Sequence, residues 1–408
     1  MIESLPKVFE KNLCNHCLGR LHSGLLTGFT NEQRGEAIRM YVAMMIDAKL
    51  IDSAGMDLAN FHGFRFRSGL KAEKEEQCWL CHNLFDDLDK IADEACRKLK
   101  NMEFETFLVG SKVSGGILGR EEKMWEITGI EFVESIKSEI NRELGKKLEK
   151  MLCKEVNFKK PDVLIIANMA KCKVDLQINS VYVLGYYKKM KRGIPQSKWG
   201  TPGHYKTSVQ EIVAKPFIKA SKAKGNSFHG YGREDIDARC LDWRPFVIEM
   251  ESPVKRKFIL KKIEKNINKG SKVKVKILRY CDKSTVRRIK TEGGDKTYCV
   301  TVKLSKPIQK KDLGKLKKLV GIISQRTPTR VAHRRADLVR KRKVKEIKYK
   351  WVNSKTIELK VKTNAGLYVK EFVSGNGGRT IPSVAQALGV DATPKNLDVI
   401  EIQRPKGI

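Results

Sequence analysis

The spacing of apolar residues predicts that the first part of the chain is mainly helical. Residues 31–51 carry apolar side chains at helical spacing after Asn31. Residues 84–102 begin with acidic residues and end with basic ones, which matches the direction of a helix dipole. Within residues 133–152, apolar residues recur every four positions, which marks one face of an amphipathic helix: Ile136, Ile140, Leu144 and Leu148.

Strand-like segments surround the last of these helices. Residues 104–113 (FETFLVGSKV) and 162–169 (DVLIIANM) have the composition of strands, and residues 173–190 predict one further strand, joined to the second by AKCK. We therefore expect an α/β unit over residues 104–192. Its basic exit, rich in Gly, Pro and Lys, indicates a domain boundary.

Beyond this boundary the pattern changes to period two. A helix is expected over residues 208–221 and a strand over 244–250. Alternation over residues 272–278, 296–304 and 355–363 predicts an antiparallel sheet with one solvated face. We predict an α+β protein with three regions: a helical region at 1–103, an α/β region at 104–195, and a domain at 205–408 whose central antiparallel or mixed sheet is flanked by helices.

The charge of the chain indicates its partner. Lys and Arg outnumber Asp and Glu 82 to 47 over 408 residues, and 41% of the residues are hydrophobic, enough for globular domains. A formal charge of +35 favours contact with nucleic acid over an anionic membrane or a merely well-solvated surface. No apolar run approaches the roughly 20 residues of a membrane span, and the N-terminus has no signal core. We expect a soluble, cytoplasmic protein.

Four of the ten cysteines have the spacing of metal ligands. Cys14 and Cys17 form one CxxC pair, and Cys78 and Cys81 form another. Two such pairs can supply four thiolates to one tetrahedral zinc ion, which would stabilise the helical region rather than catalyse a reaction. Two unrelated redox or buried pairs, or an iron–sulfur cluster, remain alternatives.

Two basic tracts are candidates for RNA contact. Residues 330–350 hold ten Lys or Arg residues, and we predict a basic helix that contacts phosphates, with a solvated surface as the alternative. Residues 186–199 mix cations with aromatic residues, which suits RNA, although a linker with packing aromatics has the same composition. The candidates are Arg330, Arg334, Arg335, Arg340, Lys188, Lys189 and Arg192.

The glycine-rich segment SKVSGGILGRE, residues 111–121, predicts a flexible basic loop. It departs from the ATP-binding SGG loop of RNA-thiolating enzymes, because Leu118 and Gly119 stand where that loop has Asp and Ser. The chain also lacks a P-loop and a G-x-G-x-x-G motif after a strand. We therefore expect chemistry that uses no nucleotide and no other organic cofactor.

Acidic residues gather at one turn of this basic chain, in GYGREDIDAR at residues 230–239. Asp235 follows Arg233, and Gly232 permits an unusual backbone angle before them. A carboxylate beside a cation is a competent nucleophile. A turn acid or a helix N-cap with surface ion pairs explains the same residues, so the turn by itself does not decide between the two.

Three motifs in order resemble those of the pseudouridine synthases. GREDIDAR resembles the turn that carries the catalytic aspartate of that superfamily, KTYC at residues 296–299 resembles its K-x-Y strand, and AGLYVKEFV at residues 365–373 resembles its third motif. Together with GRTIPS and the two CxxC pairs, they are similar to the archaeal tRNA pseudouridine synthase family that modifies uridines 54 and 55 of the T-loop. The resemblance spans the whole chain, and residues 104–195 resemble a THUMP domain.

This resemblance implies roles for individual residues. Asp235 would be the catalytic nucleophile, Tyr298 would stack on the flipped uracil, and Lys370, on a strand, would pair with Asp235. Relatives often carry arginine at the position of Lys370, so a point-charge contact is expected rather than a bidentate one. Tyr368 would line the pocket, and Arg233 would contact the aspartate or a phosphate. A core aromatic and a solvated lysine are the plainer readings of Tyr298 and Lys370.

The resemblance thus implies a tRNA-modifying isomerase that works as a monomer on the T-arm. The rival interpretations are a non-catalytic, zinc-containing RNA-binding protein and a THUMP-bearing tRNA methyltransferase or thiolation enzyme. Convergence of Asp235, Tyr298 and Lys370 would favour the isomerase, because a simple binding protein has no need of it.

Overall fold

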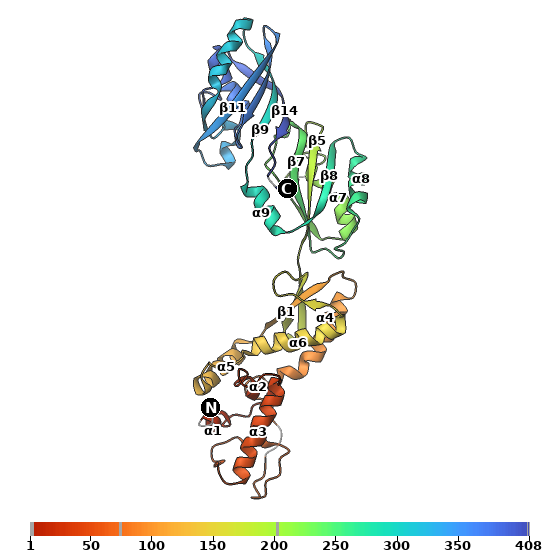
Figure 1. Ribbon diagram of the computed structural model, residues 1–408, viewed down its shortest axis with the longest axis vertical. Helices are drawn as coiled ribbons and strands as arrows, with labels where there is room; N and C mark the ends of the chain where they lie inside the picture. The colour runs from red at the N-terminus through yellow and green to blue at the C-terminus, as the bar shows by residue number, and fades with distance from the viewer. Residues whose placement is uncertain (1–3, 73–75, 201–203, 406, 408) are drawn as a thin grey trace. The chain divides into compact units, whose positions relative to one another are not determined.

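The computed structural model describes residues 4–72, 76–200, 204–405 and 407. The chain forms two compact units, Met1–Asn179 and Ser180–Ile408 (Figure 1). The border between them falls earlier than the one expected from the Gly- and Pro-rich segment.

The N-terminal unit is mainly helical, as the apolar spacing predicts. Thr30 begins the longest of its early helices with a capping box, in which its side chain and that of Gln33 bind each other's backbone N–H groups. The helices are α1 (Leu5–Val8), α2 (Asn15–Arg20), α3 (Asn31–Asp47), α4 (Leu88–Leu99), α5 (Gly115–Thr128) and α6 (Ile136–Leu152), with short 3₁₀ helices at Leu58–Phe61, Leu84–Asp87 and Met169–Lys171.

Helix α5 corrects the prediction of a flexible loop at residues 111–121. The helix begins after Ser114 and includes all three glycines of the segment, Gly115, Gly116 and Gly119. Contacts with other parts of the chain hold this helix in place. Ile117 and Met124 are buried in the core, and buried Glu121 forms an ion pair with buried Arg20 of α2. Tertiary packing therefore overrides the low helix propensity of glycine here.

A four-stranded sheet completes this unit, in the order β2-β1-β3-β4. Its strands are β1 (Thr106–Lys112), β2 (Glu155–Val156), β3 (Val163–Asn168) and β4 (Lys173–Ile178). Strand β1 runs parallel to β2 and β3, and β4 is antiparallel to β3. The four apolar residues predicted on one face of α6 are fully buried in the core that also contains Phe107 and Ile165 of this sheet, so the amphipathic helix is confirmed.

The strand predicted over residues 173–190 is two strands. The first strand, β4, ends at Ile178, and β5 (Val181–Lys189) begins three residues later. Strand β5 pairs with β7 and β8 in the sheet of the C-terminal unit, and not with the strands of the α/β region. Residues on both faces of β5 contribute to hydrophobic cores, which explains why its sequence is a nearly continuous apolar run.

The C-terminal unit is built on a ten-stranded mixed sheet, with the order β13-β10-β11-β12-β9-β14-β7-β5-β8 and β6 paired to β7. In the described part of this sheet, every pairing is antiparallel except that of β14 with β7. The strands after β5 are β6 (Gly225–Gly230), β7 (Arg239–Glu251), β8 (Val273–Cys281), β9 (Lys296–Leu304), β10 (Gly321–Arg326), β11 (Val339–Asn353), β12 (Thr356–Thr363), β13 (Thr380–Ile381) and β14 (Ala392–Ile402).

Helices cover this sheet on both faces. Helices α7 (Val209–Ser221) and α8 (Leu260–Asn268) bury one face of the β5–β7–β8 region, and α9 (Lys283–Thr291) buries the other (Figure 1). Helices α10 (Val369–Ser374) and α11 (Val384–Leu388) pack on the half around β9 and β12 with a 3₁₀ helix at Lys310–Leu319. The predicted α+β class is confirmed.

The basic tract at residues 330–350 is not a helix. It forms a 3₁₀ turn, η6 (Thr329–Arg334), and then the long strand β11. Ile347, Tyr349 and Trp351 alternate along β11 and pack against the core, while Lys348 and Lys350 point away from it. The many Lys and Arg residues of this tract obscured the alternation of apolar and charged residues that predicts a strand.

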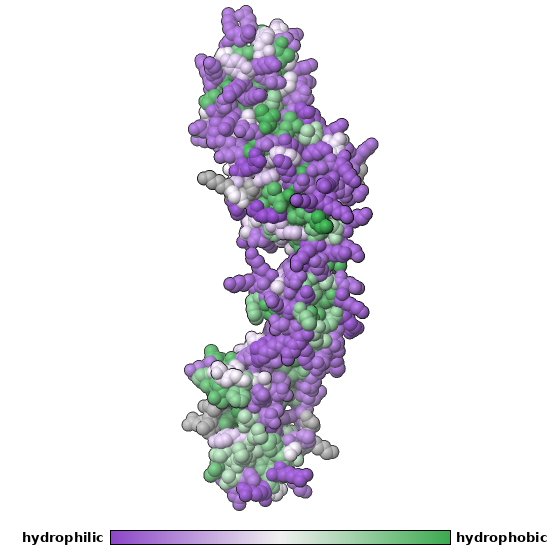
Figure 2. Space-filling model, turned by 45° about the vertical axis from the view of Figure 1, so that its right-hand side comes forward, coloured by the Kyte–Doolittle hydropathy of each residue, from purple (hydrophilic) through white to green (hydrophobic). Residues whose placement is uncertain are grey.

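The surface agrees with the composition. Hydrophilic residues cover most of the C-terminal unit in the view of Figure 2. Across the described residues, no helix is both long and apolar enough to cross a bilayer.

Candidate active site

The acidic turn, residues 231–238, connects β6 to β7 beside the point where β7 meets β14 in parallel. Gly232 adopts φ +74°, a left-handed conformation that favours glycine. The N–H of Ala238 donates to the carbonyl of Asp235 at 3.0 Å, and the N–H of Gly193 donates to that of Ile236 at 2.9 Å. The backbone of the turn is therefore fixed, and Asp235 leaves it with its side chain one-third exposed.

Two cations contact the carboxylate of Asp235. Arg330 places Nη1 3.3 Å from Oδ1 and Nη2 3.2 Å from Oδ2, a two-pronged contact. Lys370 lies 3.5 Å from Oδ2, but its Nζ is only 2.7 Å from both carboxylate oxygens of Asp237. Partial burial opposes the ionised form of Asp237, but the hydrogen bond from Lys370 lowers the pKa of Asp237 overall. The expected contact of Lys370 with Asp235 is present, and Arg330 makes the closer one.

Lys370 lies on helix α10 and not on the predicted strand. The turn before the helix is held by Gln325 of β10, whose side chain accepts from the N–H of Tyr368 and donates to the carbonyl of the same residue, both at 2.9 Å. Gln325, which is distant in sequence, thus fixes the turn from which the helix that carries Lys370 begins.

Asp235 lines a cavity of about 590 Å³, together with Tyr298, Tyr368 and Arg233. Tyr298 comes from β9, as the alternation predicts, and its ring is partly buried. Burial raises the pKa of Tyr298 to about 12, so its phenol stays protonated at neutral pH. Arg233 is exposed and lies at the rim of the cavity. Residues from all three of the motifs that resemble those of pseudouridine synthases therefore line one cavity.

Cations form another wall of this cavity. Arg335 donates to the hydroxyl of Tyr368 at 2.9 Å, and Arg340 donates to Oγ1 of Thr327 at 2.9 Å. Both side chains line the cavity with Arg330. The side chain of Arg334 lies outside the part of the chain that the structure describes.

The cations of the second basic tract, residues 186–199, contact an aromatic ring, a carboxylate and backbone carbonyls. Lys188 is half-buried with its Nζ 4.8 Å from the ring centroid of Trp243. Arg192 binds the carboxylate of Asp398 and backbone carbonyls, including that of Asp237. Lys189 has a fully buried side chain. The prediction that Lys189 contacts RNA is therefore wrong, because no phosphate can reach it.

Lys296 and Arg342 also line the cavity and were not among the predicted site residues. Lys296 is buried next to Gly232 and 5.5 Å from the ring centroid of Tyr231, and burial, reinforced by the positive charge of Arg244, lowers the pKa of Lys296 to about 8. Arg342 packs on Gly366, where a Cβ atom would lie 2.9 Å from its Nε. Gly366, the second residue of the third motif, was the available sequence signal for this close approach.

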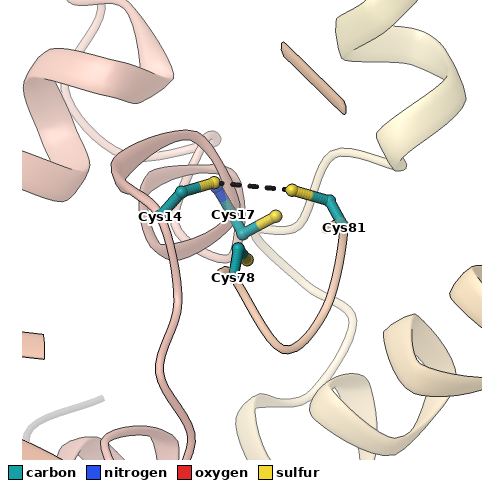
Figure 3. Close-up of side chains that lie close together, drawn as sticks. All are labelled: Cys14, Cys17, Cys78 and Cys81. Carbon is teal, nitrogen blue, oxygen red and sulfur yellow. Dashed lines mark hydrogen bonds between the residues drawn. The ribbon is translucent and has the colours of Figure 1, made fainter. Parts of the chain in front are cut away.

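The four predicted metal ligands converge in the N-terminal unit. Their Sγ atoms all lie within 4.8 Å of one another, from two segments far apart in sequence (Figure 3). Burial raises the pKa of the Cys17 thiol, so four neighbouring thiolates require a cation among them. Arg20 places Nη2 3.9 Å from Sγ of Cys17 and adds positive charge. Four cysteine sulfurs at this spacing can bind one metal ion in a closed, structural site.

Comparison with known proteins identifies the family. A family model described as "Pus10, C-terminal" matches residues 182–403, and one described as "Pus10 THUMP domain, archaeal" matches residues 91–168. The tRNA pseudouridine synthase Pus10 of Pyrococcus furiosus is 39% identical over 406 residues, 98% of each chain. That of Methanothrix thermoacetophila is 37% identical over 414 residues, covering 96% of this chain and 91% of the other. The chain belongs to the Pus10 family of tRNA pseudouridine synthases.

Membership in the Pus10 family confirms the predicted family and the predicted type of enzyme. The THUMP prediction is also confirmed, although the matched region begins within α4 and ends with β3. Solved structures are less similar. A chain in the "Crystal Structure of a Cbf5-Nop10-Gar1 Complex" is 17% identical, with a TM-score of 0.33 over 53% of this chain and 48% of the other, which supports no further conclusion.

Proposed function

We propose that this Pus10 family member isomerises uridine to pseudouridine at positions 54 and 55 of the tRNA T-loop, with Asp235 as the nucleophile. The observation that carries the proposal is the convergence of Asp235, Tyr298 and Lys370 in or beside one cavity, from three segments separated in sequence. A protein that only bound RNA would have no need for this arrangement.

The reaction needs no redox partner. Asp235 attacks the nucleotide, the C1′–N1 bond breaks, and the uracil rotates and forms a C1′–C5 bond. The proton on C5 is lost and N1 gains one, so atoms and electrons balance. Arg330 and Lys370 stabilise the negative charge of the nucleophile. Tyr298 provides a protonated phenol and an aromatic face for the extruded base.

The cationic wall supports an RNA substrate. Flipping a base out of a structured loop costs a few kcal/mol, and contacts between phosphates and cations can offset this cost. Arg335 and Arg340 line the cavity where the phosphates flanking a flipped nucleotide would lie. Arg233 at the rim is available for a further phosphate.

Two finer expectations accompany the proposal. We propose zinc as the ion held by the four cysteines, because a Cys₄ set with tetrahedral reach is typical of structural zinc. A cytoplasmic monomer acting on the T-arm remains the sequence-based prediction for the working form.

The test compares two substitutions in the same turn. We expect Asp235→Asn to abolish pseudouridine formation on an unmodified tRNA transcript while tRNA affinity stays close to that of the wild type. Asp237→Asn is the matched control, since it removes a neighbouring carboxylate, and it should retain activity. Mapping pseudouridine along the tRNA identifies the modified positions. A wild-type yield from Asp235→Asn would refute the role of Asp235, and product outside the T-loop would refute the proposed site.

A further inference from the structure

A group of buried polar side chains lies directly beneath the acidic turn. The side chains of Tyr187 and Lys189 on β5, Glu234 in the turn, and Arg244 on β7 are at most 1% exposed. None of these four was predicted to position the turn. We call them, with the buried Gln196, the turn-support network.

Lys189 binds the backbone of the turn. Its Nζ donates to the carbonyls of Asp235 at 2.9 Å and Ile236 at 3.2 Å, and to that of Ile194 at 2.9 Å. Three carbonyls satisfy the three donors of an ammonium group. A single buried cation thus joins the segment after β5 to the two residues at the centre of the turn.

The other members hold the first half of the turn. Arg244 donates from Nη1 to the carbonyl of Tyr231 at 2.9 Å, and Gln196 donates to that of Gly232 at 2.9 Å. With Lys189, the network binds the carbonyls of residues 231, 232, 235 and 236. Side chains from β5, β7 and the β5–α7 connection therefore fix the beginning and the centre of the turn that carries Asp235.

Glu234 anchors the turn from within. Its carboxylate accepts a hydrogen bond from the hydroxyl of Tyr187 at 2.9 Å and forms ion pairs with Arg244 at 3.2 Å and Lys189 at 3.7 Å. Glu234 is fully buried and its neighbour Asp235 is one-third exposed. Because the two residues are adjacent in the turn, holding the side chain of Glu234 in the interior fixes the backbone that carries the more exposed side chain of Asp235.

Stability alone does not explain these residues. Burial lowers the pKa of Lys189, which shows that the fold opposes its charge. Buried ion pairs can often be replaced by apolar residues of similar volume without loss of stability. Hydrogen bonds to four turn carbonyls, by contrast, define a geometry that apolar packing would not define.

We propose that Lys189 and Glu234 are positioning residues that hold the carboxylate of Asp235 at its attack position without touching the substrate. This inference rests on the proposed role of Asp235 as the nucleophile. A displacement of about 1 Å at a reacting group lowers rates by about 100-fold. The network should therefore affect the chemical step and leave tRNA affinity unchanged.

The experiment measures single-turnover release of tritium from tRNA carrying [5-³H]uridine, with enzyme in excess. The rate constant then reports the bound complex and does not depend on the fraction of enzyme that is folded. We expect Lys189→Met to lower it by about 10- to 100-fold with an unchanged Kd for tRNA. Lys274→Met is the matched control, because Lys274 on β8 also donates to a backbone carbonyl, that of Asn268, away from the turn. The control should keep the wild-type rate.

Two further variants keep the proposal falsifiable if Lys189→Met does not fold. Tyr187→Phe removes only the hydroxyl, which donates to Glu234 and accepts from Gln196, and should lower the rate several-fold. Glu234→Gln retains one acceptor oxygen and should be faster than Glu234→Leu, which has similar volume but no acceptor. Wild-type single-turnover rates in Lys189→Met or Tyr187→Phe would overturn the inference while the proposed function stood. Absence of pseudouridine formation by the wild type would overturn the proposed function, and the inference with it.

Discussion

Replacing Arg330 with methionine tests which cation stabilises the charge on Asp235. The guanidinium contacts both carboxylate oxygens, at 3.3 and 3.2 Å. At 3.2 Å two unit charges interact by about 5 kcal/mol at an effective dielectric constant of 20, and by about 1.3 kcal/mol in water. The two side chains are 39% and 33% exposed, so solvent screening brings the expected value near the lower end, about 2 kcal/mol. This corresponds to a loss of about 30-fold in the single-turnover rate.

Lys370→Met should have the smaller effect. Its Nζ is 3.5 Å from Asp235 and makes its short contacts, at 2.7 Å, with Asp237. We expect a loss of about three-fold in rate, corresponding to less than 1 kcal/mol. Arg335→Met serves as the control for removal of a cavity arginine. Because Arg335 donates to Tyr368 and not to Asp235, this change should weaken tRNA affinity more than it slows the bound complex.

The assay is tritium release from [5-³H]uridine in tRNA under single-turnover conditions, together with tRNA affinity measured on the same variants. The order of rates should be wild type, Lys370→Met, then Arg330→Met. A Lys370→Met enzyme slower than Arg330→Met would refute the reasoning, since it would make Lys370 the main partner of Asp235 despite its longer distance.

Three other outcomes are expected. Elemental analysis should find about one zinc ion per chain. Cys14→Ser should lose this ion and unfold the N-terminal unit, whereas the control Cys153→Ser should retain it. Retention of the metal by Cys14→Ser would contradict the proposed site. Burial lowers the pKa of Lys296 from 10.5 to about 8, so the folded state binds fewer protons than the unfolded state between these values. The stability of the wild type relative to Lys296→Met should therefore rise from pH 8 to 10, by at most about 3 kcal/mol in urea unfolding, and parallel pH curves would refute this. Replacing both Arg335 and Arg340 with alanine should reduce the salt slope of tRNA binding by about one for each lost phosphate contact, and an unchanged slope would count against their role.

The sequence predicted elements whose pattern reflects local geometry. The period-two segments became β8, β9 and β12, and the four-residue rhythm became α6. Helix α5 and strand β11 were missed for opposite reasons. Glycines concealed a helix that depends on packing, and a run of cations concealed alternation that was present.

The site was predicted where one short motif contained the residue, and missed where the contact joins distant segments. Asp235 and Tyr298 were identified within their motifs, whereas Arg330 reaches Asp235 across 95 positions of sequence. No local pattern reveals that contact. The turn-support network was within reach of sequence reasoning at one point. Val181, Val183, Tyr187 and Lys189 share the parity of the more completely buried face of β5, so Lys189 should have been assigned to the interior and Lys188 to the other face.

We propose that the excess of positive charge in this chain serves two functions that composition cannot separate. Cations on the surface and on the cavity wall, such as Arg335 and Arg340, would contact an RNA backbone and should make affinity depend on salt. Lys189 and Arg244 are buried, are screened much less by salt, and bind the backbone of the turn instead. If this division is correct, raising the salt concentration weakens tRNA binding in every variant, whereas the ratio of bound-complex rates between wild type and Lys189→Met stays constant.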